Sequence, residues 1–144
     1  MTVNEFHIKE INPLEAWEIL KNDPNSTLID VRTKAEFDFV GIADLRKIGK
    51  TPILLPWMNY PHMQIDTEFN YKLQEILSTK SPDQNTLLFL CRSGGRSLQA
   101  AKSAALLGYQ CYNIINGFEG DANTSGHRGQ TNGWKASNLD WRQN

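Results

Sequence analysis

The stretch Leu87-Leu88-Phe89-Leu90-Cys91-Arg92-Ser93-Gly94-Gly95-Arg96-Ser97 decides how the rest of the chain is interpreted. Its apolar beginning is short enough to be a buried strand. From Ser97 onward the pattern becomes helical, and it stops at Gly108, a residue type that favours helix ends. The sequence therefore predicts a lone cysteine where a strand gives way to a helix, beneath a loop of small and cationic residues.

The loop after Cys91 contains what is needed to hold an anion. A helix start offers unpaired N–H groups and a positive dipole end. Gly94 and Gly95 allow amides to turn inward, because glycine accepts positive φ, and Arg92 and Arg96 add positive charge. These surroundings favour a thiolate and could stabilise the terminal sulfur of a persulfide. The alternative is that Cys91 is a buried structural cysteine. A purely structural loop would not gather two arginines and two glycines around one thiol.

The composition excludes several classes of protein. With 15 Lys+Arg against 16 Asp+Glu, the chain lacks the basic excess typical of nucleic-acid binders. No apolar run approaches the length of a membrane span, no signal-peptide pattern opens the chain, and two cysteines make no disulfide framework. We therefore expect a cytoplasmic protein without nucleic-acid or membrane partners. The three histidines share no metal-ligand spacing, so we predict neither metal nor cofactor.

Short apolar runs alternate with helical patterns along the 144 residues, which predict one domain. Asn12 and Thr33 are predicted helix caps, because Glu15 and Glu36 follow them at capping-box spacing. Strands are expected at 6–11, 27–31, 51–56, 87–91 and 109–115, and helices at 13–20, 33–39, 66–77 and 97–107. This alternation predicts an α/β fold with a mainly parallel sheet, whose sites lie beyond the carboxyl ends of the strands.

The end of the chain changes character. From Gly117 onward it holds five of the ten glycines and two of the four tryptophans. We therefore expect residues 1–120 to form the domain and residues 121–144 to be an irregular extension packed on it. Trp134 and Trp141 are the expected anchors of that extension.

For other polar or reactive residues, we favour a structural role over a role in the site. Asp30 and Arg32 follow a predicted strand and could belong to the wall of the site. We favour a structural role, in which Arg32 pairs with Glu36 one helical turn on and Asp30 organises the loop. Cys111 could resolve a persulfide as a disulfide, but its apolar strand without cations favours a place in the core.

Two motifs together resemble the rhodanese-like family. Cys91-Arg92-Ser93-Gly94-Gly95-Arg96-Ser97 matches the Cys-x-x-Gly-x-Arg-Ser loop of its single-domain sulfurtransferases. Leu28-Ile29-Asp30-Val31-Arg32-Thr33-Lys34-Ala35-Glu36-Phe37 matches the Asp-Val-Arg…Glu-Phe segment that precedes it in the family. The resemblance implies a three-layer α/β/α fold around a central, mainly parallel five-stranded sheet.

The resemblance also implies an activity and a site. It implies that Cys91 takes a sulfane sulfur from thiosulfate or a protein persulfide and passes it to cyanide or a thiol. The residues implied to cradle that sulfur or bind the anionic donor are Arg92, Ser93, Gly94, Gly95, Arg96 and Ser97. Among them Arg96 is the favoured donor contact, because the Arg-Ser ending is the shared part of the motif.

The chain departs from the family pattern after the fifth strand. Asn116-Gly117 stands where the family often has Gly-Gly, and Asp121 stands where it often has tryptophan. We therefore expect Trp134 or Trp141 to complete the wall of the cleft there.

Two other functions remain open. A cysteine-dependent phosphatase needs an arginine six positions after the cysteine, where this chain has Ser97, and its loop must hold a larger anion. A non-catalytic rhodanese-like binding module typically lacks the cysteine, which this chain keeps.

Overall fold

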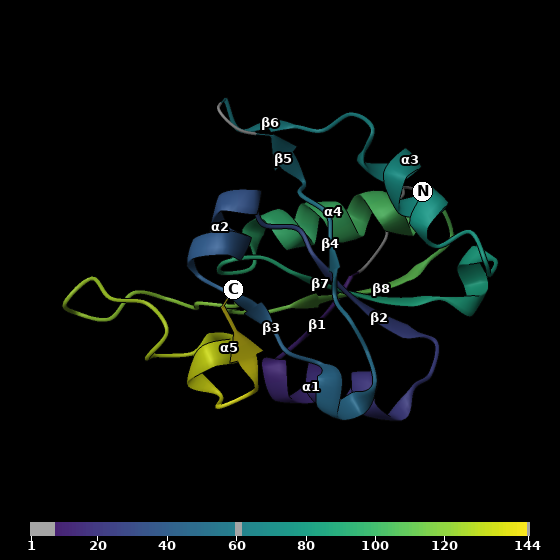
Figure 1. The fold of residues 1–144 in the computed structure, drawn as a ribbon. Helices are drawn as coiled ribbons and strands as arrows, with labels where there is room; N and C mark the ends of the chain where they lie inside the picture. The colour runs from purple at the N-terminus through teal and green to yellow at the C-terminus, as the bar shows by residue number, and fades with distance from the viewer. Residues whose placement is uncertain (1–7, 60–61, 144) are drawn as a thin grey trace.

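Five parallel strands form the central sheet, in the order β1-β8-β7-β2-β4 (Figure 1). The computed structural model describes residues 8–59 and 62–143. The strands are β1 (Lys9–Ile11), β2 (Ser26–Asp30), β4 (Ile53–Leu54), β7 (Thr86–Leu90) and β8 (Gln110–Ile114). The predicted α/β fold with a parallel five-stranded sheet is confirmed. Residues 6 and 7 of the first predicted strand lie outside the described residues.

Helices cover both faces of the sheet and complete three layers. They are α1 (Pro13–Asn22), α2 (Lys34–Phe39), α3 (Phe69–Ile76), α4 (Gly95–Ala105) and α5 (Gly133–Ala136). In Figure 1, α2, α3 and α4 lie on one side, and α1 and α5 on the other. Alternate residues of β7 serve the two faces: Leu87 and Phe89 pack with α3 and α4, while Leu88 and Leu90 pack with α1.

Helices α1 and α2 begin as predicted. The Asn12 side chain accepts the Glu15 N–H at 2.8 Å, and the Glu15 carboxylate accepts the Asn12 N–H at the same distance. Thr33 and Glu36 form an equivalent capping box on α2. These caps satisfy N–H groups that the helices cannot pair internally, which explains why local sequence located both helix starts.

The loops hold structure that the sequence did not reveal. α3 begins at Phe69 rather than directly after Asp66, whose carboxylate pairs with Lys72 at 2.6 Å. The segment between the predicted strand at 51–56 and the predicted helix at 66–77 contains two short strands that pair antiparallel, and 3-10 turns occur elsewhere in the described residues. These short elements are β3 (Ile42–Ala43), β5 (Met58–Asn59), β6 (Gln64–Ile65), η1 (Arg46–Ile48) and η2 (Pro82–Gln84).

The chain after Gly120 leaves the body of the molecule as a projecting loop and returns as α5 (Figure 1). Trp134 of α5 is fully buried and meets Trp17 of α1 edge to face, with ring centroids 6.2 Å apart. Strand β9 (Trp141–Arg142) then pairs antiparallel with β3. The helix and strand in this segment were not predicted. Trp134 is the buried anchor, whereas Trp141 remains 39% exposed.

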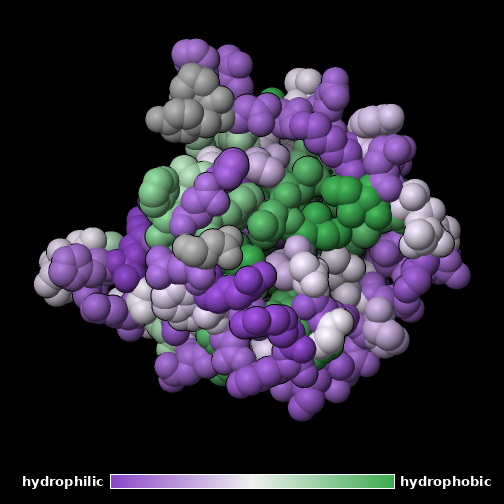
Figure 2. Space-filling model, in the orientation of Figure 1, coloured by the Kyte–Doolittle hydropathy of each residue, from purple (hydrophilic) through white to green (hydrophobic). Residues whose placement is uncertain are grey.

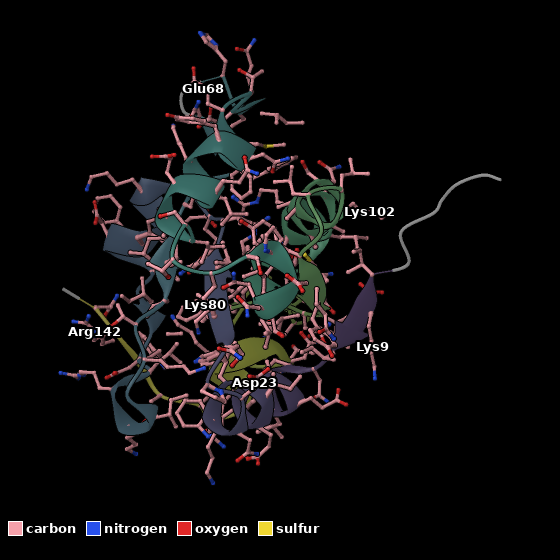
Figure 3. All side chains as sticks on the ribbon, turned by 90° about the vertical axis from the view of Figure 1, so that its right-hand side faces the viewer. Lys9, Asp23, Glu68, Lys80, Lys102 and Arg142 are labelled. Carbon is pink, nitrogen blue, oxygen red and sulfur yellow. The ribbon has the colours of Figure 1, made fainter. Side chains whose placement is uncertain are left out.

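The surface mixes charges of both signs. The charged side chains labelled in Figure 3 come from different parts of the chain, in helices, strands and the segments between them: Lys9, Asp23, Glu68, Lys80, Lys102 and Arg142. Apolar residues gather over β4 and α3 in Figure 2, and Leu54 and Ile76 of these elements are exposed. Within residues 8–59 and 62–143, no helix combines the length and apolar character needed to cross a membrane.

Candidate active site

Cys91 directly follows β7, the middle strand of the sheet. The Val31 N–H donates to the Leu90 carbonyl at 2.9 Å, so β2 and β7 end side by side. Cys91 is a free cysteine, only 1% exposed, and packs with the core beneath α3 and α4. It therefore occupies the strand-to-helix junction that the sequence predicted, at the end of the sheet where parallel folds place their sites.

Two groups of the loop approach the sulfur. The Gly94 N–H donates to Sγ at 3.1 Å, and the Ser97 hydroxyl oxygen lies 3.3 Å from Sγ. Gly94 has φ of +120°, which favours glycine and turns its amide toward the sulfur. Gly95 instead begins α4, and the first turn of that helix offers further unpaired N–H groups. Of these two glycines, only Gly94 therefore has the positive φ that favours glycine.

The start of the loop is held by the turn after β8. Three successive N–H groups at 118–120 donate to the carbonyl oxygens of Cys91 and Arg92, at distances of 2.8 to 3.1 Å. The backbone of this turn thus flanks the cysteine loop. Trp134 packs with α1 on the opposite face of the sheet, whereas the Trp141 ring meets Phe118 of this turn edge to face, with centroids 6.2 Å apart. That one of these tryptophans completes the wall of the cleft stays a prediction.

The two arginines of the loop differ in their surroundings. Arg96 makes two parallel hydrogen bonds to the Glu36 carboxylate, at 2.8 and 3.0 Å, and both side chains are only 19% exposed. Arg92 is exposed beside Ser93 at the tip of the loop and forms no ion pair with any described residue. Arg96 therefore braces α4 against α2, and Arg92 is the cation left facing solvent.

Glu36 gives the protein a predicted acid sensitivity. Burial by itself raises the pKa of Glu36, but hydrogen bonds from Arg96 and Thr33 lower it from 4.5 to about 2. The folded state therefore binds this proton more weakly than the unfolded chain. The stabilisation is fully present above about pH 5 and is lost as pH falls toward 2.

We expect Glu36→Gln to reduce the free energy of unfolding by about 2 kcal/mol at neutral pH. Because glutamine does not titrate, the variant should also lose part of the wild-type decline between pH 5 and pH 2. Urea denaturation across this pH range measures both effects. Parallel pH curves for the two proteins would contradict the assignment.

Asp30 and Arg32 form a buried ion pair behind the cysteine loop. The Arg32 Nε donates to Asp30 Oδ1 at 2.9 Å, and Nη2 donates to Asp30 Oδ2 and to the Gly41 carbonyl, each at 2.7 Å. The guanidinium also lies 4.2 Å from the ring centroid of Phe118. The prediction that Arg32 pairs with Glu36 is wrong: the Arg32 side chain turns back to the strand end, and Glu36 is taken by Arg96.

Asn113 is a polar side chain near the sulfur that the sequence analysis missed. It lies on β8, and its Oδ1 is 2.5 Å from the hydroxyl oxygen of Ser97. Both side chains are essentially unexposed. The available signal was a polar residue within an otherwise apolar strand, because a buried amide needs partners.

Cys111 lies in the core, as predicted. It is 8% exposed, and burial raises the pKa of its thiol to about 12, so the unreactive protonated form prevails. In the described part of the chain, no group of three or more His, Cys, Asp or Glu residues is arranged to hold a metal ion.

The layered parallel sheet, with a cysteine loop leading from β7 into α4, defines the rhodanese-like class of α/β proteins. The crystal structure of Rv0390 from M. tuberculosis matches the fold with a TM-score of 0.85. The two sequences are 38% identical, and the match covers 96% of this chain and 99% of that one. The rhodanese-like fold implied by the two sequence motifs is therefore confirmed.

The family is defined more closely by sequence. The family model of the STR4 middle domain matches residues 10–144, so the chain belongs to the STR4 middle domain family. The uncharacterized protein RC0915 of Rickettsia conorii is 36% identical over 136 residues, 94% of this chain and 98% of its own length. The thiosulfate:glutathione sulfurtransferase of Saccharomyces cerevisiae is 30% identical over 115 residues, 79% of this chain and 68% of its own length.

Proposed function

We propose that the protein is a sulfurtransferase that carries a sulfane sulfur as a persulfide on Cys91. The observation that carries the proposal is the Gly94 N–H, which points at Sγ from 3.1 Å at the beginning of α4. Amide donors and a helix N-terminus stabilise negative charge on sulfur, in the thiolate and in a persulfide. The name of the yeast relative, a thiosulfate:glutathione sulfurtransferase, supports this class of reaction.

The reaction proceeds in two displacements. The Cys91 thiolate attacks the outer sulfur of thiosulfate, the sulfur–sulfur bond of the donor breaks, and sulfite leaves with the bonding electron pair. The lone pair of cyanide or of a thiolate then attacks the terminal sulfur of the persulfide. The bond between the terminal sulfur and Sγ then breaks, and its electron pair returns to Sγ, which regenerates the Cys91 thiolate. The transferred sulfur departs as thiocyanate when cyanide is the acceptor, or as a new persulfide when a thiol is. A persulfide on another protein can replace thiosulfate as the donor, and the scheme uses no cofactor.

Turnover with thiosulfate and cyanide tests this proposal. The wild-type protein should form thiocyanate, and Cys91→Ser should form none. Cys111→Ser removes the other thiol of the chain and should retain the activity. Hydrolysis of an aryl phosphate without thiocyanate formation would indicate a phosphatase instead, and neither activity would indicate a binding module. The loop geometry disfavours the phosphatase, because buried Ser97 stands where that enzyme needs its arginine.

Arg92 is the proposed contact for an anionic donor, in place of the Arg96 favoured by the motif. Arg92→Ala should raise KM for thiosulfate about tenfold, with little change in stability. Arg96→Ala should instead lower the free energy of unfolding by about 2 kcal/mol, because it leaves the Glu36 carboxylate unpaired. Steady-state kinetics and denaturation of the two variants separate these roles. If KM for thiosulfate rises in Arg96→Ala but not in Arg92→Ala, then Arg96 and not Arg92 contacts the donor.

We further propose a reducing compartment, the cytoplasm. Both cysteines are free, and Cys91 can receive sulfur only while its thiol is reduced. A reporter fusion retained with cytoplasmic markers after cell fractionation would support this placement, and export would contradict it.

A further inference from the structure

Ser97 has one hydroxyl proton and three possible acceptors for it. Its Oγ lies 2.5 Å from Oδ1 of Asn113, 3.2 Å from the Gly94 carbonyl oxygen and 3.3 Å from Sγ of Cys91. Ser97 and Asn113 are 0% and 1% exposed, so the choice is made among these buried groups. Which acceptor takes the proton decides whether Ser97 faces the sulfur as a donor or as an acceptor.

The orientation of Asn113 makes that choice. Its Nδ2 donates to the Glu10 carboxylate at 3.0 Å and to the Gly94 carbonyl at 3.2 Å. Both partners are acceptors only, so the amide nitrogen must face them and Oδ1 must face Ser97. An amide oxygen has no proton to give, and the hydrogen in the 2.5 Å contact therefore belongs to Ser97.

The strand pairing supports this orientation. Glu10 and Asn113 stand opposite each other in the parallel register of β1 and β8. The Glu10 carboxylate is therefore placed beside the amide nitrogen by the sheet itself. The chain of contacts runs from β1 through β8 to the start of α4, and it ends at the sulfur.

We propose that Asn113 is a positioning residue that directs the Ser97 hydroxyl proton away from Cys91. Ser97 then presents a lone pair to Sγ and accepts the thiol proton, so it stabilises the resting thiol rather than the thiolate. The consequence rests on the proposed function: in a persulfide carrier, this restrains the unloaded cysteine from reacting with stray electrophiles. Backbone amides and the start of α4 are left to stabilise the anionic states.

Substitution of Asn113 leaves the neighbouring charges in place. The charged groups that surround this part of the molecule come from the loop, from α2, from the end of β2, from β1 and from the turn after β8. They are Arg92, Arg96, Glu36, Asp30, Arg32, Glu10 and Glu119. A change in Cys91 reactivity in an Asn113 variant therefore reports on the hydrogen bonds that Asn113 makes to Ser97, Gly94 and Glu10, and a second variant at Ser97 separates the first of these from the others.

The test is the rate of alkylation of Cys91 by iodoacetamide, an uncharged reagent, at one neutral pH. Asn113→Leu leaves the sulfur and the Gly94 carbonyl as the acceptors of the Ser97 proton, so the sulfur gains a share of this hydrogen bond and the rate constant should rise by up to about tenfold. Ser97→Ala removes an acceptor of the thiol proton and should leave the rate unchanged or raised. The double variant should be no faster than Ser97→Ala, because the freed proton is then missing. Cys111, buried in the same strand as Asn113, should stay unmodified in every folded variant.

Two results would overturn the proposal. A tenfold lower rate in Ser97→Ala would show that Ser97 donates to the sulfur in the wild-type protein. An equal rise in Asn113→Leu and in the double variant would show general loosening of the loop. If Asn113→Leu unfolds, as alkylation of Cys111 would reveal, the sign of the Ser97→Ala effect decides. Alkylation does not depend on sulfur transfer, so failure of the proposed function would appear separately, as absence of thiocyanate from the wild-type protein.

Discussion

Replacing Gly117 by alanine is expected to lower the free energy of unfolding by about 2–4 kcal/mol and to remove sulfur transfer. A Cβ at this position would lie 2.4 Å from the Cys91 carbonyl oxygen and 2.5 Å from the Arg92 carbonyl group. These are backbone atoms of the proposed cradle, so they cannot yield without moving the loop. Gly117 also has φ of +61°, which disfavours alanine. Chemical denaturation and thiocyanate formation measure the two effects.

Gly126→Ala is the matched control for Gly117→Ala. Gly126 has φ of +81°, but a Cβ there would meet nothing within 4 Å. The control therefore carries the backbone strain without the collision and should lose only about 1 kcal/mol. Equal losses in the two variants would mean that backbone conformation, and not contact with the cysteine loop, explains the need for Gly117.

Trp134→Ala is the second large expected effect, a loss of about 3–5 kcal/mol in the free energy of unfolding. The side chain is fully buried, and its Nε1 donates to the Asp140 carbonyl at 2.9 Å. The Trp134 backbone N–H also donates to the Gly117 carbonyl at 2.8 Å, which connects α5 to the turn that holds the cysteine loop. Activity should therefore decline along with stability, as thermal unfolding and turnover of the same sample will show.

Trp141→Ala provides the comparison within the same segment. Its side chain is 39% exposed, meets the buried Phe118 ring edge to face, and lies under the Lys135 ammonium at 3.9 Å. We expect a loss of about 1 kcal/mol. If Trp134→Ala were as mild as Trp141→Ala, the segment after Gly120 would contribute little to the stability of the fold.

Local signals explain why the sequence predicted the sheet and the cysteine junction. The apolar run from Leu87 to Leu90 had to be buried, and the structure buries it on both faces of a parallel sheet. The caps at Asn12 and Thr33 are satisfied within four residues of chain, so the helix starts were readable. Short-range patterns of this kind need no knowledge of the tertiary structure.

The groups with which the site residues pair could not be predicted from local sequence. Glu36 was recognised as a capping residue, but its second role as the partner of Arg96 joins positions 60 residues apart in sequence. Arg32 had two carboxylates within reach along the chain, and only the fold selects Asp30. The turn at 118–120 uses backbone groups, which every residue has, so no residue type announces its contact with the cysteine loop.

The most direct measurement of the central claim is the mass of the protein after incubation with thiosulfate and removal of the excess donor. We predict the addition of one sulfur atom, mapped to the peptide that contains Cys91, and its removal by cyanide. Cys91→Ser should show no added mass. An unchanged wild-type mass, or sulfur carried on Cys111 instead, would contradict the assignment of Cys91 as the sulfur carrier.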